Sequence, residues 1–278
     1  MASAKDIIVK PIKSSAANAL VKRIHDSGKV VQNSSLHFGA FLDGRLEGVM
    51  SFGSPMDKRK VLPLVEGTSW TGMLELNRMA FSDRLPKNSE SRCLAVAFRL
   101  IKKHYPHIDW ILSFSDGTQC GDGTIYRASG FVLTGIKANN SIWRAPNGES
   151  FAETALRPGI GGSKAIAKAE TISRIYMIKG KHLAASGGKS SMQRFKDAGW
   201  EPIPGYQLRY IYFLNPAARQ RLTVPILPFS KIDEMGARMY KGVSYARTKQ
   251  ANSSDQLERG GVTPTCTLQN TPKIIREC

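Results

Sequence analysis

The feature that most constrains the fold is an amphipathic stretch at residues 89–104, which has an apolar, strand-like segment on either side. Within it Leu94, Phe98 and Ile101 recur at helical spacing, and Asn88 is a favourable N-cap residue. A helix of this length between two strands is expected to cover one face of a sheet. The chain is therefore expected to be of mixed α/β type.

The remaining pattern indicates more strands than helices. Alternation of apolar and polar side chains over residues 73–81 is typical of a half-buried strand, and Asp43-Gly44 between two apolar runs predicts a hairpin. The expected strands are 6–12, 37–41, 46–52, 73–81, 110–114, 131–136, 175–178 and 206–214. The expected further helices are 14–28, capped by Ser14 or Ser15, 124–129 and 191–198. This order predicts an α/β (α+β) fold with a central sheet flanked by helices.

Composition changes along the chain and suggests a domain division. We expect one domain over residues 1–215, with a Gly/Ser/Lys-rich, basic insertion at about 141–190. A basic extension follows at 216–278, and its polar composition after about residue 250 predicts a disordered tail.

The chain carries a large excess of positive charge. Lys and Arg number 40 and Asp and Glu number 22, so the formal charge is +18, with a sequence pI near 9.9. This excess predicts a polyanionic partner, first of all nucleic acid, and a solvated basic face is the alternative. The residues expected to contact DNA phosphates lie in the basic insertion: Lys164, Lys168, Arg174, Lys179, Lys181 and Lys189.

Several classes of protein are disfavoured by composition. Apolar residues make up 41% of the chain, which argues against disorder throughout. No apolar run approaches the roughly 20 residues of a membrane span, so we expect no membrane partner. Four scattered cysteines do not indicate a disulfide framework, which favours the cytoplasm.

The start of the helix at 89–104 is a candidate anion site. The first turn of a helix presents unpaired N–H groups and the positive end of the dipole. Asn88, Ser89 and Ser91 add polar groups there, and Arg92 adds charge, so this corner is suited to a phosphate, a pyrophosphate or a carboxylate. An ordinary capped helix with solvated charges is the alternative.

A second polar segment runs from residue 116 to 131 and contains three closely spaced glycines. Asp116 directly follows a strand, where ligands tend to bind, and Tyr126 is a candidate general acid unless it simply packs under its helix. Arg78 lies in a strand among apolar neighbours and needs a partner. A structural ion pair with Glu75, Asp116 or Asp122 competes with an anion-binding role for Arg78.

These segments resemble known families. Strand, long helix, strand and a short helix reading Ile125-Tyr126-x-x-x-Gly130-Phe131 resemble the GNAT acyltransferase superfamily, which implies a GNAT-like mixed sheet. More narrowly, residues 75–79, 88–92 and 116–131 together look like the Mom family of phage DNA-modification proteins. The similarity covers roughly residues 5–145 and extends more loosely to 214.

The resemblance implies a function and a set of site residues. It implies an enzyme that converts adenine in double-stranded DNA to N6-carbamoylmethyladenine and shields phage DNA from restriction in the host cytoplasm. By motif position, the implied catalytic residues are Arg78, Ser91, Asp116 and Tyr126. His25 stands where the family has a His-Tyr-Ser turn and is the candidate metal ligand, because iron is proposed for the family. A homodimer is a further expectation.

The donor group is left open at this point. GNAT enzymes hold a pyrophosphate on a glycine-containing loop, whereas residues 84–89 contain no glycine. Acetyl-CoA and an aminoacyl donor are therefore both candidates, with Asn88, Ser89 and Arg92 as the binding residues.

Other functions compete with this interpretation. A GNAT-type N-acyltransferase acting on another substrate and a non-catalytic, basic DNA-binding module both fit the same sequence. An adenine methyltransferase does not, because the chain has neither an Asp/Asn-Pro-Pro-Tyr motif nor a Gly-rich SAM loop.

Overall fold

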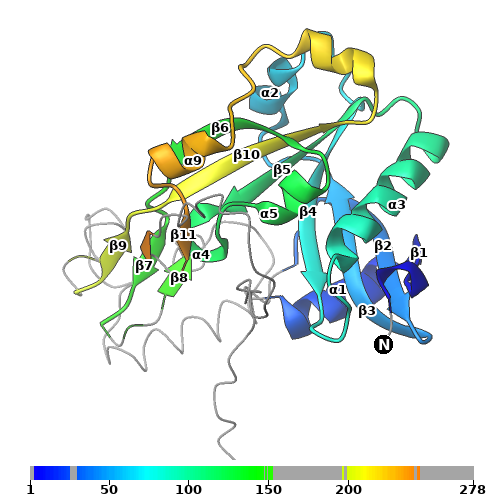
Figure 1. Cartoon of the computed structure of the whole chain (residues 1–278), viewed down its shortest axis with the longest axis horizontal. Coiled ribbons are helices and arrows are strands. Elements are labelled where there is room, and N and C mark those ends of the chain that lie inside the picture. Colours follow the sequence, from blue (N-terminus) through cyan, green and yellow to red (C-terminus); the bar gives the residue numbers. More distant parts are fainter. Residues whose placement is uncertain are drawn as a thin grey trace, which may run out of the picture.

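A seven-stranded mixed sheet forms the centre of the protein (Figure 1). The computed structural model describes residues 3–25, 30–146, 148, 150–152, 196, 199–240 and 243–244. The strands lie in the order β1-β2-β3-β4-β5-β10-β6. Their bounds are β1 Ile8–Pro11, β2 Ser34–Leu42, β3 Arg45–Gly53, β4 Met73–Phe81, β5 Trp110–Asp116, β6 Val132–Ala138 and β10 Tyr206–Phe213. The expected α/β class with a central mixed sheet is confirmed.

All neighbouring strands of this sheet run antiparallel except β4 and β5. That parallel pair is short, because its register runs only from Met73 opposite Trp110 to Glu75 opposite Leu112. Beyond this point β4 stays paired with β3 and β5 stays paired with β10. Residues 76–81 of β4 and 113–116 of β5 are therefore not paired with each other, and we call these two stretches together the divergence.

The two faces of the sheet are covered by different helices. Helix α3 (Ser89–His104) buries Leu94, Phe98 and Ile101 against one face, as its apolar spacing predicts. Helix α1 (Ser14–Ile24) packs Ala17, Leu20 and Val21 against the other face, over Val49 of β3 and Ala80 of β4. The divergence therefore lies between an α3 face and an α1 face.

The other elements are short and lie around this core. They are the helices η1 Ala4–Asp6, α2 Lys58–Val61, η2 Leu62–Leu64, α4 Gly117–Cys120, α5 Thr124–Ala128, η3 Pro216–Arg221 and α9 Ser230–Glu234. A three-stranded sheet consists of β7 Ile142–Arg144, β8 Ser150–Ala152 and β9 Glu201–Ile203, and a two-stranded one of β11 Met239–Tyr240 and β12 Val243–Ser244.

Residues 216–240, at the start of the expected extension, pack onto the central sheet. Ala218, Ile232 and Ala237 are fully buried, and the Leu227 N–H donates to the Leu133 carbonyl at 2.8 Å. In Figure 1, β11 lies beside α4, and α9 lies near β6 and β10 at that end of the sheet. The domain boundary at residue 215 stays a prediction, but it does not coincide with a break in packing.

Two helix caps differ from expectation. Lys13 rather than Ser14 or Ser15 is the N-cap of α1, and that helix ends at Ile24, short of the expected end at residue 28. Asn88 is the N-cap of α3, but its side chain makes no capping hydrogen bond, because its backbone is left-handed with φ 67° and ψ 13°. Dihedral angles, not composition, decide whether a side chain reaches the first N–H groups.

Much of the basic insertion lies outside the described residues, including the expected strand at 175–178 and most of the expected helix at 191–198. Within the part of the chain that the structure describes, no helix is long and apolar enough to cross a bilayer.

Candidate active site

A bulge in β4 shapes the strand side of the divergence. Ser51 of β3 lies opposite Arg78, and Phe52 lies opposite Leu76, so Asn77 is one extra residue in β4. The side chain of Leu76 packs on the α3 face, whereas that of Ala80 packs on the α1 face. With the extra residue between them, Glu75 and Arg78 both point to the α1 face.

Glu75 and Arg78 form a half-buried polar pair there. Burial raises the pKa of the Glu75 carboxyl to about 7, against an opposing hydrogen bond from Asn77 and the charge of Arg78. Burial lowers the pKa of the Arg78 guanidinium, against the opposing charges of Glu75 and Tyr126. Of the three partners that the sequence allowed for Arg78, the structure therefore supports Glu75. A carboxyl with a pKa near 7 was not expected from the sequence, since burial decides it.

Tyr126 approaches the same place from the α3 face. Its ring packs against Phe131 at 5.3 Å and against Tyr210 at 5.1 Å between centroids. Its hydroxyl lies 3.5 Å from the Phe114 carbonyl oxygen of β5, at the divergence.

Asp116 is the last residue of β5 and lies on the same face as Arg78. Trp110, Leu112 and Phe114 alternate onto that face, and Asp116 continues the alternation. Its carboxylate accepts a hydrogen bond from the Thr118 N–H at 3.0 Å and caps α4. The structure therefore places Arg78 in β4, Asp116 at the end of β5 and the Tyr126 hydroxyl beside the β5 backbone, all three at the divergence.

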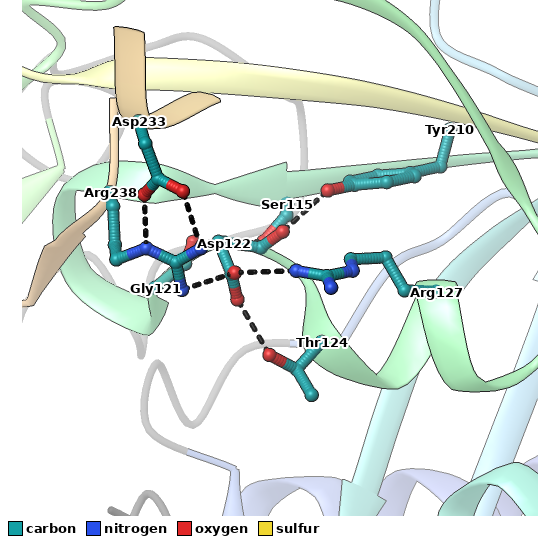
Figure 2. Close-up of polar contacts among 8 residues, drawn as sticks. All are labelled: Ser115, Gly121, Asp122, Thr124, Arg127, Tyr210, Asp233 and Arg238. Carbon is teal, nitrogen blue, oxygen red and sulfur yellow. Dashed lines mark hydrogen bonds and ion pairs between the residues drawn. The ribbon is translucent and has the colours of Figure 1, made fainter. Parts of the chain in front are cut away.

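The loop between Asp116 and Tyr126 is held by a buried ion network (Figure 2). The Asp122 carboxylate is 2.5 Å from Arg238, 3.2 Å from Arg127 and 2.6 Å from the Thr124 hydroxyl. Arg238 also pairs with Asp233 at 2.5 Å. Burial tends to raise the pKa of the Asp122 carboxyl, but Thr124 and the two arginines outweigh it and lower that pKa. Neither Arg238 nor Asp233 was expected from the sequence, because no local pattern links them to Asp122.

A basic hollow of about 680 Å³ opens at the start of α3. Asn88, Ser91 and Arg92 of the expected anion site line it, and its other lining residues include Lys5 and Lys87. Among the residues that the structure describes, no Asp or Glu lines the hollow. The left-handed backbone of Asn88 supplies the turn that glycine supplies elsewhere, since asparagine tolerates this conformation. The hollow therefore suits an anionic group of a donor, such as a pyrophosphate.

Ser89 does not belong to this hollow, contrary to the sequence-based expectation. Its side chain is buried, and its hydroxyl donates to the Pro86 carbonyl within the turn. The Ser91 hydroxyl donates to the Asn88 carbonyl at 3.2 Å and lies at the hollow. Spacing alone could not separate these two serines, because the turn at Asn88 decides which one faces inward.

The described residues do not fit an iron site. They contain no group of three or more His, Cys, Asp or Glu side chains placed to hold a metal ion. His25 is the C-cap residue of α1. Another histidine, His37, is buried against the Ser51 hydroxyl at 2.8 Å, and burial lowers its pKa. The iron expected by resemblance is therefore not supported.

The expected DNA-contacting residues Lys164, Lys168, Arg174, Lys179, Lys181 and Lys189 lie outside the described residues.

Comparison with known proteins places the chain in a family. A family model described as the Mom protein family matches residues 6–231. The chain belongs to the Mom protein family. Among its relatives, the methylcarbamoylase Mom of Escherichia phage Mu is 30% identical over 223 residues, which are 80% of this chain and 81% of that protein. The residues that match the Mom family model include the whole divergence. They also include the residues from Pro86 onward that line the basic hollow at the start of α3, which we call the α3 hollow.

Solved structures that are similar to this Mom family member include several acetyltransferases. An IAA acetyltransferase from Bacillus cereus has 10% identity and a TM-score of 0.38, and covers 74% of this chain and 99% of its own. The ribosomal-protein-S18-alanine N-acetyltransferase from Escherichia coli has 8% identity and a TM-score of 0.39, with coverages of 75% and 94%. A GNAT family acetyltransferase from Elizabethkingia anophelis with acetyl-CoA bound has 14% identity and a TM-score of 0.35, with coverages of 48% and 80%.

Proposed function

We propose that this protein is a DNA-modifying enzyme that converts adenine in double-stranded DNA to N6-carbamoylmethyladenine and thereby protects phage DNA from restriction in the host cytoplasm. The observation that carries the proposal is the family match over residues 6–231, together with the 30% identity to the phage Mu methylcarbamoylase. The formal charge of +18 supports a polyanionic substrate.

The acceptor side of the reaction is assigned to the α1 face of the divergence. The adenine amino group is delocalised into the ring, and stacking in the duplex hides it, so the base has to leave the stack at a cost of a few kcal/mol. Asp116 accepts a hydrogen bond from the amino N–H and directs the nitrogen lone pair at the donor. Arg78 orients the carbonyl group of the donor next to the attacked carbon.

The donor side is assigned to the α3 face. Tyr126 protonates the leaving group, which its position at the divergence allows, since its hydroxyl reaches the β5 backbone there. Lys87, Asn88, Ser91 and Arg92 of the α3 hollow hold the anionic part of the donor. An acyl-CoA-type donor and an aminoacyl donor are the two candidates for this hollow. For the carbamoylmethyl product, N6 has to form its new bond to a methylene carbon of the donor while the bond between that carbon and the leaving group breaks; attack on the carbonyl carbon would give an N6-acyl adenine instead.

The bond that N6 makes in the product shows whether the enzyme transfers an acyl group or attaches N6 to a methylene carbon. A carbamoylmethyl group is joined to N6 through its methylene carbon, whereas direct transfer of a glycyl group would join N6 to a carbonyl carbon. These two products have the same elemental composition, so a mass alone does not separate them. An acetyl group differs in composition from both.

Plasmid from cells that express the protein tests the proposal. After digestion to nucleosides, we expect a modified deoxyadenosine that coelutes with a synthetic N6-carbamoylmethyl standard and fragments as it does, not as the glycyl isomer. Unmodified plasmid together with retained DNA binding by the purified protein would contradict the enzyme and favour a binding module. An acetylated nucleoside would instead indicate N-acyl transfer.

A homodimer is proposed separately, and sedimentation of the full chain tests it.

A further inference from the structure

The segment after the family match reaches the loop that carries the proposed catalytic groups. The match ends at residue 231, whereas Asp233 and Arg238 lie beyond it. Both belong to the ion network around Asp122 that Figure 2 shows. In the sequence, Asp122 lies in the loop between Asp116 and Tyr126. The described C-terminal residues therefore contact the site's loop although they lie outside the region that defines the family.

Contacts at three points hold this loop against the C-terminal segment. At its start, a Cβ on Gly117 would lie 3.1 Å from the Ala237 carbonyl oxygen, so the two backbones are closely packed. In its middle, Arg238 pairs with Asp122. On α5, the Arg127 guanidinium lies 4.8 Å above the Phe229 ring.

The pair at the centre of the network, Asp122 and Arg238, is buried. Asp122 and Arg238 side chains are only 4% and 6% exposed. A buried charge that loses its partner is strongly unfavourable, which holds Asp122 in one position while Arg238 is present. The guanidinium fork bridges Asp122 and Asp233 at once, and a lysine ammonium does not have this planar geometry.

Asp122 is linked to Tyr126 through Tyr210. The Tyr210 hydroxyl donates to the Asp122 carbonyl oxygen, and the Tyr210 ring packs against Tyr126 at 5.1 Å. Gly123 between them has φ 70°, and a Cβ there would lie 2.7 Å from the Tyr210 ring. A shift of Asp122 therefore moves the ring against which Tyr126 packs.

We propose that Arg238 is a positioning residue that sets the place of Tyr126 through Asp122 and Tyr210, so that the C-terminal segment 227–240 completes the active site. The inference rests on the proposed function for its catalytic consequence. Its structural part, the dependence of Tyr126 on Arg238, can be measured without any activity.

The test uses the full chain and two substitutions, Arg238→Met and Arg238→Lys. Arg219→Met is the matched control, since Arg219 is exposed on η3. Modified adenine in co-expressed plasmid should fall about 10- to 100-fold with Arg238→Met, because small misplacements of a catalytic group cost this much. Arg238→Lys should recover part of the loss. Duplex affinity of the folded variants should stay within about twofold of the parent, since the side chain is buried.

A fluorine NMR signal of Tyr126 distinguishes a positioning role of Arg238 from an effect on the stability of the whole fold. With 3-fluorotyrosine in place of tyrosine, the Tyr126 resonance is assigned by its absence in Tyr126→Phe. We expect this resonance to move in both Arg238 variants and to stay in place in Arg219→Met. If Arg238→Met does not fold, the milder Arg238→Lys decides by the same signal.

Two results would overturn the inference. One is a Tyr126 resonance that is unchanged in a folded Arg238 variant. The other is modification by Arg238→Met within twofold of the parent. If the parent protein itself yields no modified adenine, the proposed function fails, and the fluorine signal alone decides the role of Arg238.

Discussion

The two sides of the divergence hold their polar groups by different means. On the β4 side, Glu75 and Arg78 belong to a strand that pairs with β3 along its length and lies over an apolar core. On the β5 side, Asp116 and Tyr126 flank a loop held by charges, two of them from the C-terminal segment. The first side is built locally, and the second depends on a distant part of the chain. Changes on the loop side should therefore propagate further than changes on the strand side.

The largest expected effect is on catalysis, where both sides are needed. Asp116→Asn and Tyr126→Phe should each abolish adenine modification, because one removes the charge that accepts the amino N–H and the other removes the proton donor. Arg78→Lys should leave residual modification, since the positive charge is kept. Nucleoside analysis of co-expressed plasmid measures this, with duplex affinity as the control. Full modification by either of the first two variants would remove that residue from the mechanism.

Removing one ion pair on each side of the divergence compares how much each contributes to the free energy of unfolding. Arg238→Met should lower the free energy of unfolding by about 3–5 kcal/mol, because it leaves the buried Asp122 carboxylate without one of its cations. Arg84→Met on the strand side removes a pair at 3.5 Å with the buried Glu47. Because Arg84 is 65% exposed and Glu47 keeps its hydrogen bond from the Ser82 hydroxyl, this change should cost no more than about 1 kcal/mol. Urea unfolding measures both. Equal costs would mean that the network contributes no more than this single pair with an exposed arginine.

Glycines with positive φ give a third comparison. Gly123→Ala should destabilise by about 2–4 kcal/mol, since left-handed strain adds to crowding against Tyr210. Gly44→Ala in the β2–β3 hairpin, with φ 75° and nothing within 4 Å of its Cβ, should cost only about 1–2 kcal/mol. The difference between the two measures the contact with Tyr210. If the two costs are the same, the loop moves away from Tyr210 freely.

The last comparison is a pH dependence of opposite sign on the two sides. The folded pKa of Glu75, about 7, lies above its ordinary 4.5, so the folded state loses stability as pH rises through this window, by up to about 3 kcal/mol. The lowered pKa of Asp122 makes its contribution present at these pH values and lost only below its ordinary 3.8.

Glu75→Gln should therefore remove the decline in unfolding free energy between pH 4.5 and 8. The exposed Glu234→Gln should keep the decline. Urea titrations across this range provide the measurement, and an unchanged slope in Glu75→Gln would assign the decline to another group.

Sequence patterns predicted the local structure on the strand side well. Strand β4 and helix α3 have the expected bounds, because alternation and helical spacing are properties of neighbouring residues. The bulge at Asn77 and the short parallel register of β4 with β5 were not predicted, since they arise from pairing between strands. The left-handed turn at Asn88 was also missed, and it decides that Ser91 rather than Ser89 lies at the hollow.

On the loop side, the short helix expected at 124–129 is present as α5, Thr124–Ala128, but the contacts that hold the loop were not predicted. Its motif indicated Asp116 and Tyr126, and Asp122 was considered only as a partner of Arg78. The structure instead pairs Asp122 with Arg127 and Arg238. A long-range pair of this kind leaves no period or spacing in a single sequence, so packing of the C-terminal segment had to be seen directly.

The short register between β4 and β5 has a consequence for solubility. Past Glu75, the described β4 has a ladder partner on one side only. Side chains rather than a neighbouring strand reach main-chain groups there: the Leu76 carbonyl accepts from the Ser113 hydroxyl and the Phe114 carbonyl from the Tyr126 hydroxyl, both at 3.5 Å. An open strand border at the rim of a sheet invites other chains to add to it and aggregate. Because strands continue on both sides of this opening, another polypeptide cannot add a strand there as it could at the rim.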